Sequence, residues 1–135
     1  MSMNIIRPIN KTFDKALKKA ELMFEDQHFV SNVLDSAFAK LGGLTEHLYE
    51  VQDQMLGLIR MVRAWVKREY REVSPKAIIA MLAAIIYFVN PLDLISDMIP
   101  IIGFLDDITI ITYVVTVFNK EIEKFMAWER SQAAL

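Results

Sequence analysis

The sequence contains no cysteine, only four glycines, four prolines and two histidines. Without cysteine, the chain has no disulfide framework, no thiolate nucleophile and no cysteine-based zinc site. So few glycines and prolines supply too little turn chemistry for a fold of many short strands. The histidines, His28 and His47, lie in no catalytic motif, and nothing near them supports a Ser-His-Asp arrangement. We therefore expect an all-α fold with no catalytic residues and no cofactor, although enzymatic activity stays open.

An excess of charge of one sign is also missing. The 15 lysines and arginines nearly balance the 17 acidic residues, which gives a net charge of −2. A chain with this balance is not suited as a whole to nucleic acid, so we expect no nucleic-acid partner. Apolar residues, by contrast, make up 54% of the chain, and the mean hydropathy of +0.29 is high for a soluble protein. This apolar surface must be hidden in a core, against a partner or in lipid.

The first residues do not resemble a secretory signal, because Arg7 and Pro8 are followed by a charged stretch rather than an apolar run. We therefore expect the protein to be membrane-associated and facing the cytoplasm, or alternatively soluble in the cytoplasm. The character of the chain changes near Val73. Residues 1–72 form an amphipathic three-helix region, and residues 73–135 form an apolar helical hairpin with an acidic turn.

Apolar residues at helical spacing predict three amphipathic helices in the first region. These helices cover residues 12–25, 27–41 and 46–71. Asp26 and Thr45 are the expected N-caps of the second and third helices. Gly42 and Gly43 are expected to end the second helix in the left-handed conformation that glycine tolerates. The stripe of the second helix that we expect to face the core consists of Val30, Val33, Leu34, Ala37, Phe38 and Leu41.

The second region begins with Ser74 and Pro75, a strong signal for the start of a helix. Thirteen consecutive apolar residues follow at 77–89, so the helix predicted over 76–89 has no polar face and should be buried all round. Thirteen helical residues span about 20 Å, which is short of the ~30 Å hydrocarbon core of a bilayer. The composition makes this segment a transmembrane helix candidate, whereas its length suits the centre of a soluble bundle. The sequence leaves both interpretations open.

A second apolar helix is predicted over residues 107–129. Asn90 and Pro91 should end the preceding helix, and Pro100 and Gly103 mark the turn between the two. The fold that we expect is therefore a small bundle of about five helices with a central apolar helical hairpin.

Four carboxylates, those of Asp93, Asp97, Asp106 and Asp107, lie in the connection of this hairpin. An unpaired buried carboxylate is costly, so each must be solvated, capping, paired or metal-bound. We favour helix capping for Asp106 and Asp107, and a hydrogen-bonded turn for Asp93 and Asp97. Asp93 and Asp97 are weak candidates for cation ligands, because hard cations require several oxygen atoms. A soluble cation-binding protein or enzyme that uses these four residues is the alternative function.

The residues around this connection form a spaced pattern. The pattern consists of Tyr87, Asn90, Pro91, Asp93, Leu94, Ile95, Asp97, Pro100, Gly103, Asp106 and Asp107. It resembles the core of the domain of unknown function 1232, the YkvA-like family. Ser96 departs from that pattern, because the family usually has proline there, and the turn is less constrained without it. The resemblance implies no agreed biochemical activity and no catalytic residues, and it implies membrane association.

A basic cluster precedes the most apolar segment. It consists of Arg60, Arg63, Lys67, Arg68, Arg71 and Lys76. Four of these residues have the spacing of one face of the helix predicted over 46–71, which is either a solvated face or a contact for anionic lipid. Lys120 and Lys124 lie at the other foot of the hairpin, so both feet are basic, as in a positive-inside arrangement.

We therefore predict a non-enzymatic, membrane-associated helical module. Membrane lipid or a membrane protein is the partner that the basic cluster favours. A soluble homo-oligomer that hides its apolar surface in its own interface is a further alternative.

Overall fold

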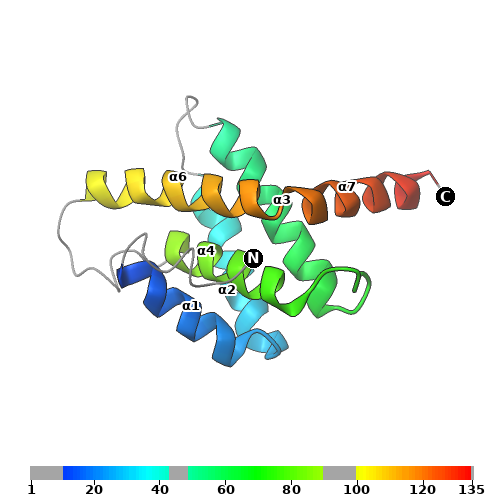
Figure 1. Cartoon of the computed structure of the whole chain (residues 1–135), viewed down its shortest axis with the longest axis horizontal. Coiled ribbons are helices and arrows are strands. Elements are labelled where there is room, and N and C mark those ends of the chain that lie inside the picture. The colour runs from blue at the N-terminus through cyan, green and yellow to red at the C-terminus, as the bar shows by residue number, and fades with distance from the viewer. Residues whose placement is uncertain (1–10, 43–48, 90–99, 135) are drawn as a thin grey trace.

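The computed structural model describes residues 11–42, 49–89 and 100–134 (Figure 1). These residues form six helices and no strand, which confirms the predicted all-α bundle. The helices are α1 (Lys11–Met23), α2 (Gln27–Leu41), α3 (Tyr49–Val66), α4 (Pro75–Val89), α6 (Pro100–Val117) and α7 (Asn119–Ala133).

Helix α2 follows α1 after a tight turn and has the bounds that the sequence predicts. The carboxylate of Asp26 accepts a hydrogen bond from the backbone N–H of Phe29 at 3.0 Å, which confirms Asp26 as the N-cap. At the other end, α2 stops at Leu41 as predicted, and Gly42 is a right-handed C-cap with a φ of −62°. Gly43 and Thr45 lie outside the described residues.

One residue of the predicted α2 stripe lies outside the core. Phe38 is 62% exposed, although the sequence places it in the stripe of α2 that should face the core. All other residues of that stripe are buried, so the prediction is wrong for Phe38 alone.

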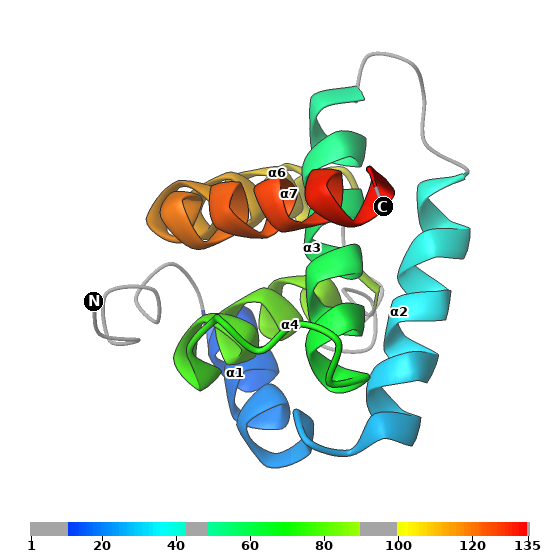
Figure 2. The same ribbon diagram turned by 90° about the vertical axis from the view of Figure 1, so that its right-hand side faces the viewer.

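Helix α4 occupies the centre of the bundle. It packs most extensively against α1 and also contacts α2, α3 and α6. Figure 2 shows α4 between α1 on one side and α6 on the other. The buried residues of α4 are Ala77, Ile78, Ala80, Met81, Leu82, Ala83, Ala84, Ile85, Ile86, Tyr87 and Phe88. The prediction that this helix is buried all round is therefore confirmed, and each large aliphatic side chain contributes about 1.5–3 kcal/mol by leaving water.

Helix α3 ends earlier than the sequence predicts. Helical periodicity favours a helix up to Arg71, whereas α3 stops before Arg68, which is left-handed with a φ of 64°. The backbone N–H groups of Glu69 and Tyr70 both donate to the carbonyl of Ala64, at 2.9 and 3.3 Å, and so satisfy the end of the helix. Because a left-handed residue is usually glycine, no residue type in the sequence marks this end.

The last predicted helix is in fact two helices with a different start. Helix α6 begins at Pro100, so Pro100 and Gly103 belong to a helix and do not mark a turn. Proline suits the first position of a helix, where its missing N–H is not needed. Helix α7 follows α6 along the long axis of the molecule (Figure 1), after a break at Phe118, which has φ −106° and ψ 28°. A single helix over 107–129 is therefore wrong at both its start and its middle.

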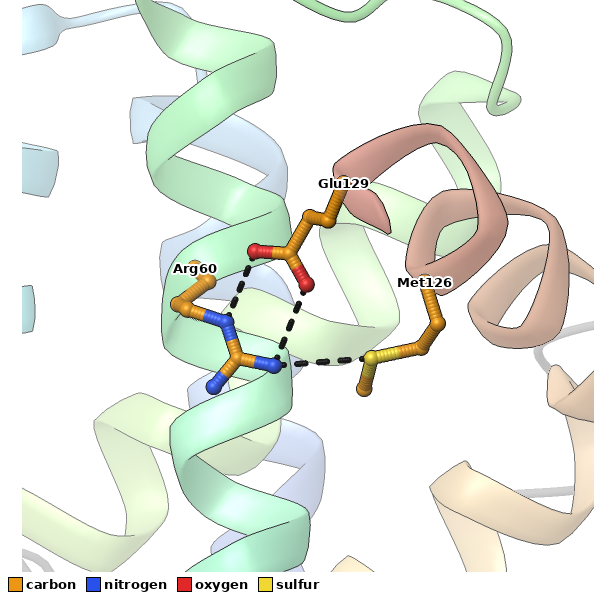
Figure 3. Close-up of polar contacts among 3 residues, drawn as sticks. All are labelled: Arg60, Met126 and Glu129. Atoms are coloured by element: carbon orange, nitrogen blue, oxygen red, sulfur yellow. Dashed lines mark hydrogen bonds and ion pairs between the residues drawn. The ribbon is translucent and has the colours of Figure 1, made fainter. Parts of the chain in front are cut away.

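Helix α7 crosses α3 and is bound to it by a small set of contacts (Figure 3). The guanidinium of Arg60 donates to the carboxylate of Glu129 from Nε at 2.8 Å and from Nη2 at 3.2 Å. The same Nη2 lies 3.4 Å from the sulfur of Met126. A Cβ atom at Gly57 would lie only 3.0 Å from the terminal methyl carbon of Met126, so glycine lets the two helices approach closely.

Candidate functional site

The start of α4 is fixed by the residues that the sequence identifies. The hydroxyl oxygen of Ser74 accepts a hydrogen bond from the backbone N–H of Ala77 at 3.2 Å, and Pro75 is the first residue of the helix. The serine satisfies one of the N–H groups that a helix start leaves free, and the proline has no N–H to satisfy. The predicted helix start is confirmed.

The end of α4, next to the acidic connection, is held from two sides. Tyr87 is fully buried, and its ring meets the ring of Phe13 edge-on, with centroids 6.2 Å apart. Lys40 of α2 donates a hydrogen bond to the carbonyl of Phe88, and its ammonium lies 4.7 Å from the centre of the Phe88 ring. A cation suits the negative C-terminal end of a helix, so Lys40 stabilises α4 where the connection begins. The sequence analysis did not single out Lys40.

The structure describes only part of the spaced pattern. Asp106 and Asp107 lie inside α6, well after its start at Pro100, so the interpretation of these two residues as helix caps is wrong. The influence of the helix dipole falls off beyond the first turn, which removes the reason for negative charge there. The members of the pattern that lie outside the described residues are Asn90, Pro91, Asp93, Leu94, Ile95 and Asp97, together with the departing Ser96. The cation-binding alternative therefore stays a prediction.

Two residues of the basic cluster are engaged in ion pairs. Arg60 binds Glu129 of α7, and Nη2 of Arg63 lies 3.1 Å from the carboxylate of Asp35 on α2. Ion pairs this exposed contribute only about 0–1 kcal/mol each to stability.

The remaining basic residues lie at or beyond the end of α3. The backbone N–H of Lys67 still donates to the carbonyl of Arg63, but the helix ends before Arg68, so the basic face predicted to reach Arg71 is wrong at Arg71. The guanidinium carbon of Arg71 lies 4.0 Å from the centre of the Trp65 ring, a cation–π contact. Lys67, Arg68 and Lys76 are exposed, and within the described ranges no ion pair involves any of them.

A shallow cleft of about 370 Å³ brings together cations from both feet of the predicted hairpin. Arg71 precedes α4, whereas Lys120 and Lys124 come from the start of α7, and all three line the cleft. Glu72 and Glu121 line it too, and Nζ of Lys124 lies 3.3 Å from the Glu72 carboxylate. The cleft therefore has one more cation than anion, and it unites residues that are far apart in the sequence.

Tyr70 is a buried phenol beside α7. Its ring packs against those of Phe125 and Trp128, with centroids 5.2 and 5.1 Å away. Its hydroxyl has no hydrogen-bond partner in the part of the chain that the structure describes. Burial raises the pKa of the Tyr70 hydroxyl above its ordinary value of 10.0, and the charge of Glu72 raises the pKa further, against the opposing effect of Lys124. The sequence analysis missed this residue, because nothing in its spacing sets it apart.

The described residues hold neither a cluster of metal ligands nor a helix that could span a membrane. Among them, no three His, Asp or Glu side chains come close enough together to hold a metal ion. None of the helices as described combines the length and the apolar character needed to cross a bilayer. The candidate metal ligands Asp93 and Asp97 are not among these residues.

Part of the chain is similar to known proteins. Residues 77–113 match the model of the family described as "Protein of unknown function (DUF1232)". The chain is also similar to the "Uncharacterized membrane protein YkvA" of Bacillus subtilis (strain 168), with 35% identity over 69 residues. This similarity covers 51% of the chain and 65% of that relative, which is less than two thirds of its length. No solved structure matches the chain.

Proposed function

The chain belongs to the DUF1232 family through residues 77–113, and from this premise we propose that it is a non-enzymatic module that binds a membrane surface. The contact is made by a basic end, which we define as Lys67, Arg68, Arg71, Lys76, Lys120 and Lys124. Its partner is the anionic lipid of the cytoplasmic leaflet, whose negative potential attracts clustered lysines and arginines.

The observation that carries the proposal is the cleft between the two feet of the hairpin. Arg71, Lys120 and Lys124 line it, although α4 and α6 separate the first of them from the other two. Arg71 also lines the neighbouring cleft with Arg68, so the cations extend beyond a single depression. Each lysine or arginine close to an anionic surface contributes about 1 kcal/mol of attraction. The name of the Bacillus subtilis relative, a membrane protein, agrees with this role.

The position of α4 supports contact at the surface rather than insertion. The sequence leaves open that α4 enters the bilayer, yet its side chains are the centre of the protein core. To insert, α4 would have to leave α1, α2 and α3, and its apolar contacts would only be exchanged for lipid. Cations on the outside of an intact bundle require no such rearrangement.

The experiment is co-sedimentation of the full chain with vesicles of phosphatidylcholine, with or without phosphatidylserine. We expect binding only to the vesicles that contain phosphatidylserine, and loss of that binding at high salt, because exposed charges are screened. The triple variant Lys76→Glu, Lys120→Glu and Lys124→Glu should lower the partition coefficient about a hundredfold, since three contributions of about 1 kcal/mol are lost.

The matched control reverses three exposed charges elsewhere on the molecule. Lys15, Lys18 and Lys19 lie on α1, and their replacement by glutamate changes the net charge by the same amount. We expect this control to keep most of the binding. Equal loss in both triple variants would overturn the assignment of the basic end. Release from cell membranes by detergent alone, and not by salt, would overturn surface binding altogether.

A further inference from the structure

The cleft between the two feet of the hairpin has a chemistry that a general attraction to anionic lipid does not require. Its volume of about 370 Å³ lies at the lower end of the ~300–1,000 Å³ typical of ligand sites, so it suits a small polar group. Three cations, those of Arg71, Lys120 and Lys124, line it together with Ser74. They come from the loop before α4 and from α7, so only the folded chain brings them together.

The guanidinium of Arg71 is positioned by its own surroundings. Its central carbon lies 4.0 Å from the centre of the Trp65 ring, and Trp65 is only 4% exposed. A cation–π contact leaves the planar fork of N–H donors available for an anion. In the part of the chain that the structure describes, no carboxylate forms an ion pair with Arg71 or Lys120. Two of the three cations are therefore open to a ligand.

Ser74 adds a neutral donor to these cations. Its oxygen accepts a hydrogen bond from the backbone N–H of Ala77 at 3.2 Å, and this interaction leaves the hydroxyl proton free to donate. The residue is exposed, so a ligand can reach it. The positive end of the α4 dipole lies at the same place and adds to the attraction that the side chains exert on an anion.

The third cation is held by a carboxylate of the cleft itself. Nζ of Lys124 lies 3.3 Å from the carboxylate of Glu72, and the two side chains are 61% and 68% exposed. Ion pairs this exposed are weak, so an anion with a larger charge can take the place of Glu72. Glu121 also lines the cleft, and with Glu72 it repels a ligand that carries a carboxylate.

We propose that the cleft binds a phosphomonoester, a terminal phosphate group with a charge of about −1.5 to −2 and three free oxygen atoms. The inference rests on the proposed function for the source of this phosphate, which is a lipid headgroup of the phosphatidic acid type. The fork of Arg71 and the ammonium groups of the two lysines then bind its oxygen atoms. Phosphatidylserine fits less well, because its phosphate is esterified on both sides and its serine carries a carboxylate.

The first test compares vesicles that contain phosphatidic acid with vesicles that contain phosphatidylserine, adjusted to equal electrophoretic mobility. We expect the full chain to bind those with phosphatidic acid about tenfold more tightly, which is the effect of one additional hydrogen bond to a charged group. Arg71→Lys keeps the charge but not the fork, so this preference should largely disappear. A wild-type chain without the preference would overturn the inference and leave the proposed surface binding in place.

A second pair of variants separates competition by Glu72 from a change in net charge. Glu72→Gln removes the carboxylate that holds Lys124, so it should increase the preference for phosphatidic acid. The matched control is Glu69→Gln, because Glu69 is exposed in the same loop and does not line the cleft. The control should raise binding to both vesicles alike. Equal preferences in the two variants would overturn the assignment to the cleft, and circular dichroism melting shows that each variant is folded.

Inorganic phosphate tests the cleft without a membrane. It should raise the melting temperature of Glu72→Gln more than that of Glu69→Gln, because a ligand of the folded state stabilises it, while the general effect of the salt is the same for both. If the chain binds neither kind of vesicle, the proposed function is overturned, and this difference would still support the cleft as a site for free phosphate. Equal rises together with the preference for phosphatidic acid would assign the cleft to lipid phosphate alone. Equal rises without that preference would overturn the inference.

Discussion

Helices α4 and α7 have the same length, fifteen residues each, but they are held in the molecule in different ways. In α4, eleven side chains are buried and every face contacts another helix. In α7, only Phe125 is buried. Its other contacts include the partly buried Ile122 and Trp128, the side chain of Met126, and the ion pairs Arg60–Glu129 and Lys124–Glu72. The position of α4 is thus determined by apolar character over its whole surface, whereas that of α7 depends on a few specific side chains.

The difference follows from the distribution of apolar residues in the two helices. The segment with the highest apolar content is the one that the other helices surround, because it has no polar face to turn toward water. The amphipathic α7 lies at the edge, where its polar face remains solvated. We expect the two helices to respond differently to substitution.

The largest effect is expected from a cavity in α4. Ile85 is fully buried, and Ile85→Ala should lower the free energy of unfolding by about 3 kcal/mol, through lost transfer energy and a cavity that its neighbours cannot fill. Urea unfolding followed by circular dichroism measures this loss. Ile79 of the same helix is only partly buried, so Ile79→Ala is the matched control and should cost clearly less. Equal losses would contradict the difference in burial between Ile85 and Ile79.

A smaller effect, of the opposite sign, is expected where α7 rests on Tyr70. Tyr70→Phe removes a buried hydroxyl that has no hydrogen-bond partner among the described residues, and it should stabilise the protein by about 1 kcal/mol. The neutral phenol is favoured in the folded state, so its pKa there lies above the ordinary 10.0. Below pH 10.0 the contribution of the raised pKa to the stability of the folded state is fully present. It is lost as the pH rises from 10.0 through the folded-state pKa, because the unfolded state releases its phenolic proton more readily than the folded state does.

Thermal melts of the wild type and Tyr70→Phe at increasing alkaline pH examine this titration. We expect the wild type to lose stability faster than the variant above the ordinary pKa of tyrosine. Parallel curves would mean that the hydroxyl of Tyr70 is hydrogen-bonded or solvated in the folded protein. A variant less stable than the wild type at neutral pH would contradict the absence of a partner.

The smallest effect is expected from the ion pair that joins α7 to α3. A double-mutant cycle of Arg60→Ala and Glu129→Ala should give a coupling energy of about 0.5 kcal/mol, because both side chains are partly exposed. The energy should shrink at high salt. Urea unfolding of the four proteins provides the measurement. A coupling energy near that of the α4 cavity would show that α7 depends on this pair rather than on Phe125 and its aromatic neighbours.

Much of the fold can be predicted from the sequence where local chemistry and tertiary packing agree. Asp26 begins α2 and Ser74 begins α4, because each side chain accepts a hydrogen bond from the first turn whatever surrounds it. The burial of α4 follows in the same way from its lack of polar residues. In these elements, a residue type is sufficient to predict the structure.

The predictions are wrong where the chain adopts a conformation without its usual residue. Arg68 is left-handed at the end of α3, where glycine is the expected residue, so charge periodicity wrongly extends the helix to Arg71. Phe118 interrupts the last helix without any glycine or proline. Pro100 suggests a turn but begins α6, because proline is compatible with both positions. In each case the signal in the sequence is ambiguous or missing.

The candidate sites were predictable only in part, because they depend on distant segments. The cations at the two feet of the hairpin can be identified from the sequence, but their union in one cleft requires the packing of α7 beside the start of α4. The exposure of Phe38 could not be predicted, since it obeys the same helical spacing as its buried neighbours. Which residue of a stripe lies at the edge depends on how the neighbouring helices α3 and α4 pack against it, which helical spacing does not reveal.

The central place of α4 also determines the order in which the chain can assemble during synthesis. Helices α1, α2 and α3 leave the ribosome before α4, and each of them packs on α4. At about 5–20 residues per second, roughly 3–13 s separate the completion of α1 from that of α4. During that interval the apolar side of α1, including Phe13 and Leu17, is not yet covered by α4. The nascent chain therefore exposes an apolar surface to chaperones until α4 has been synthesised and completes the core.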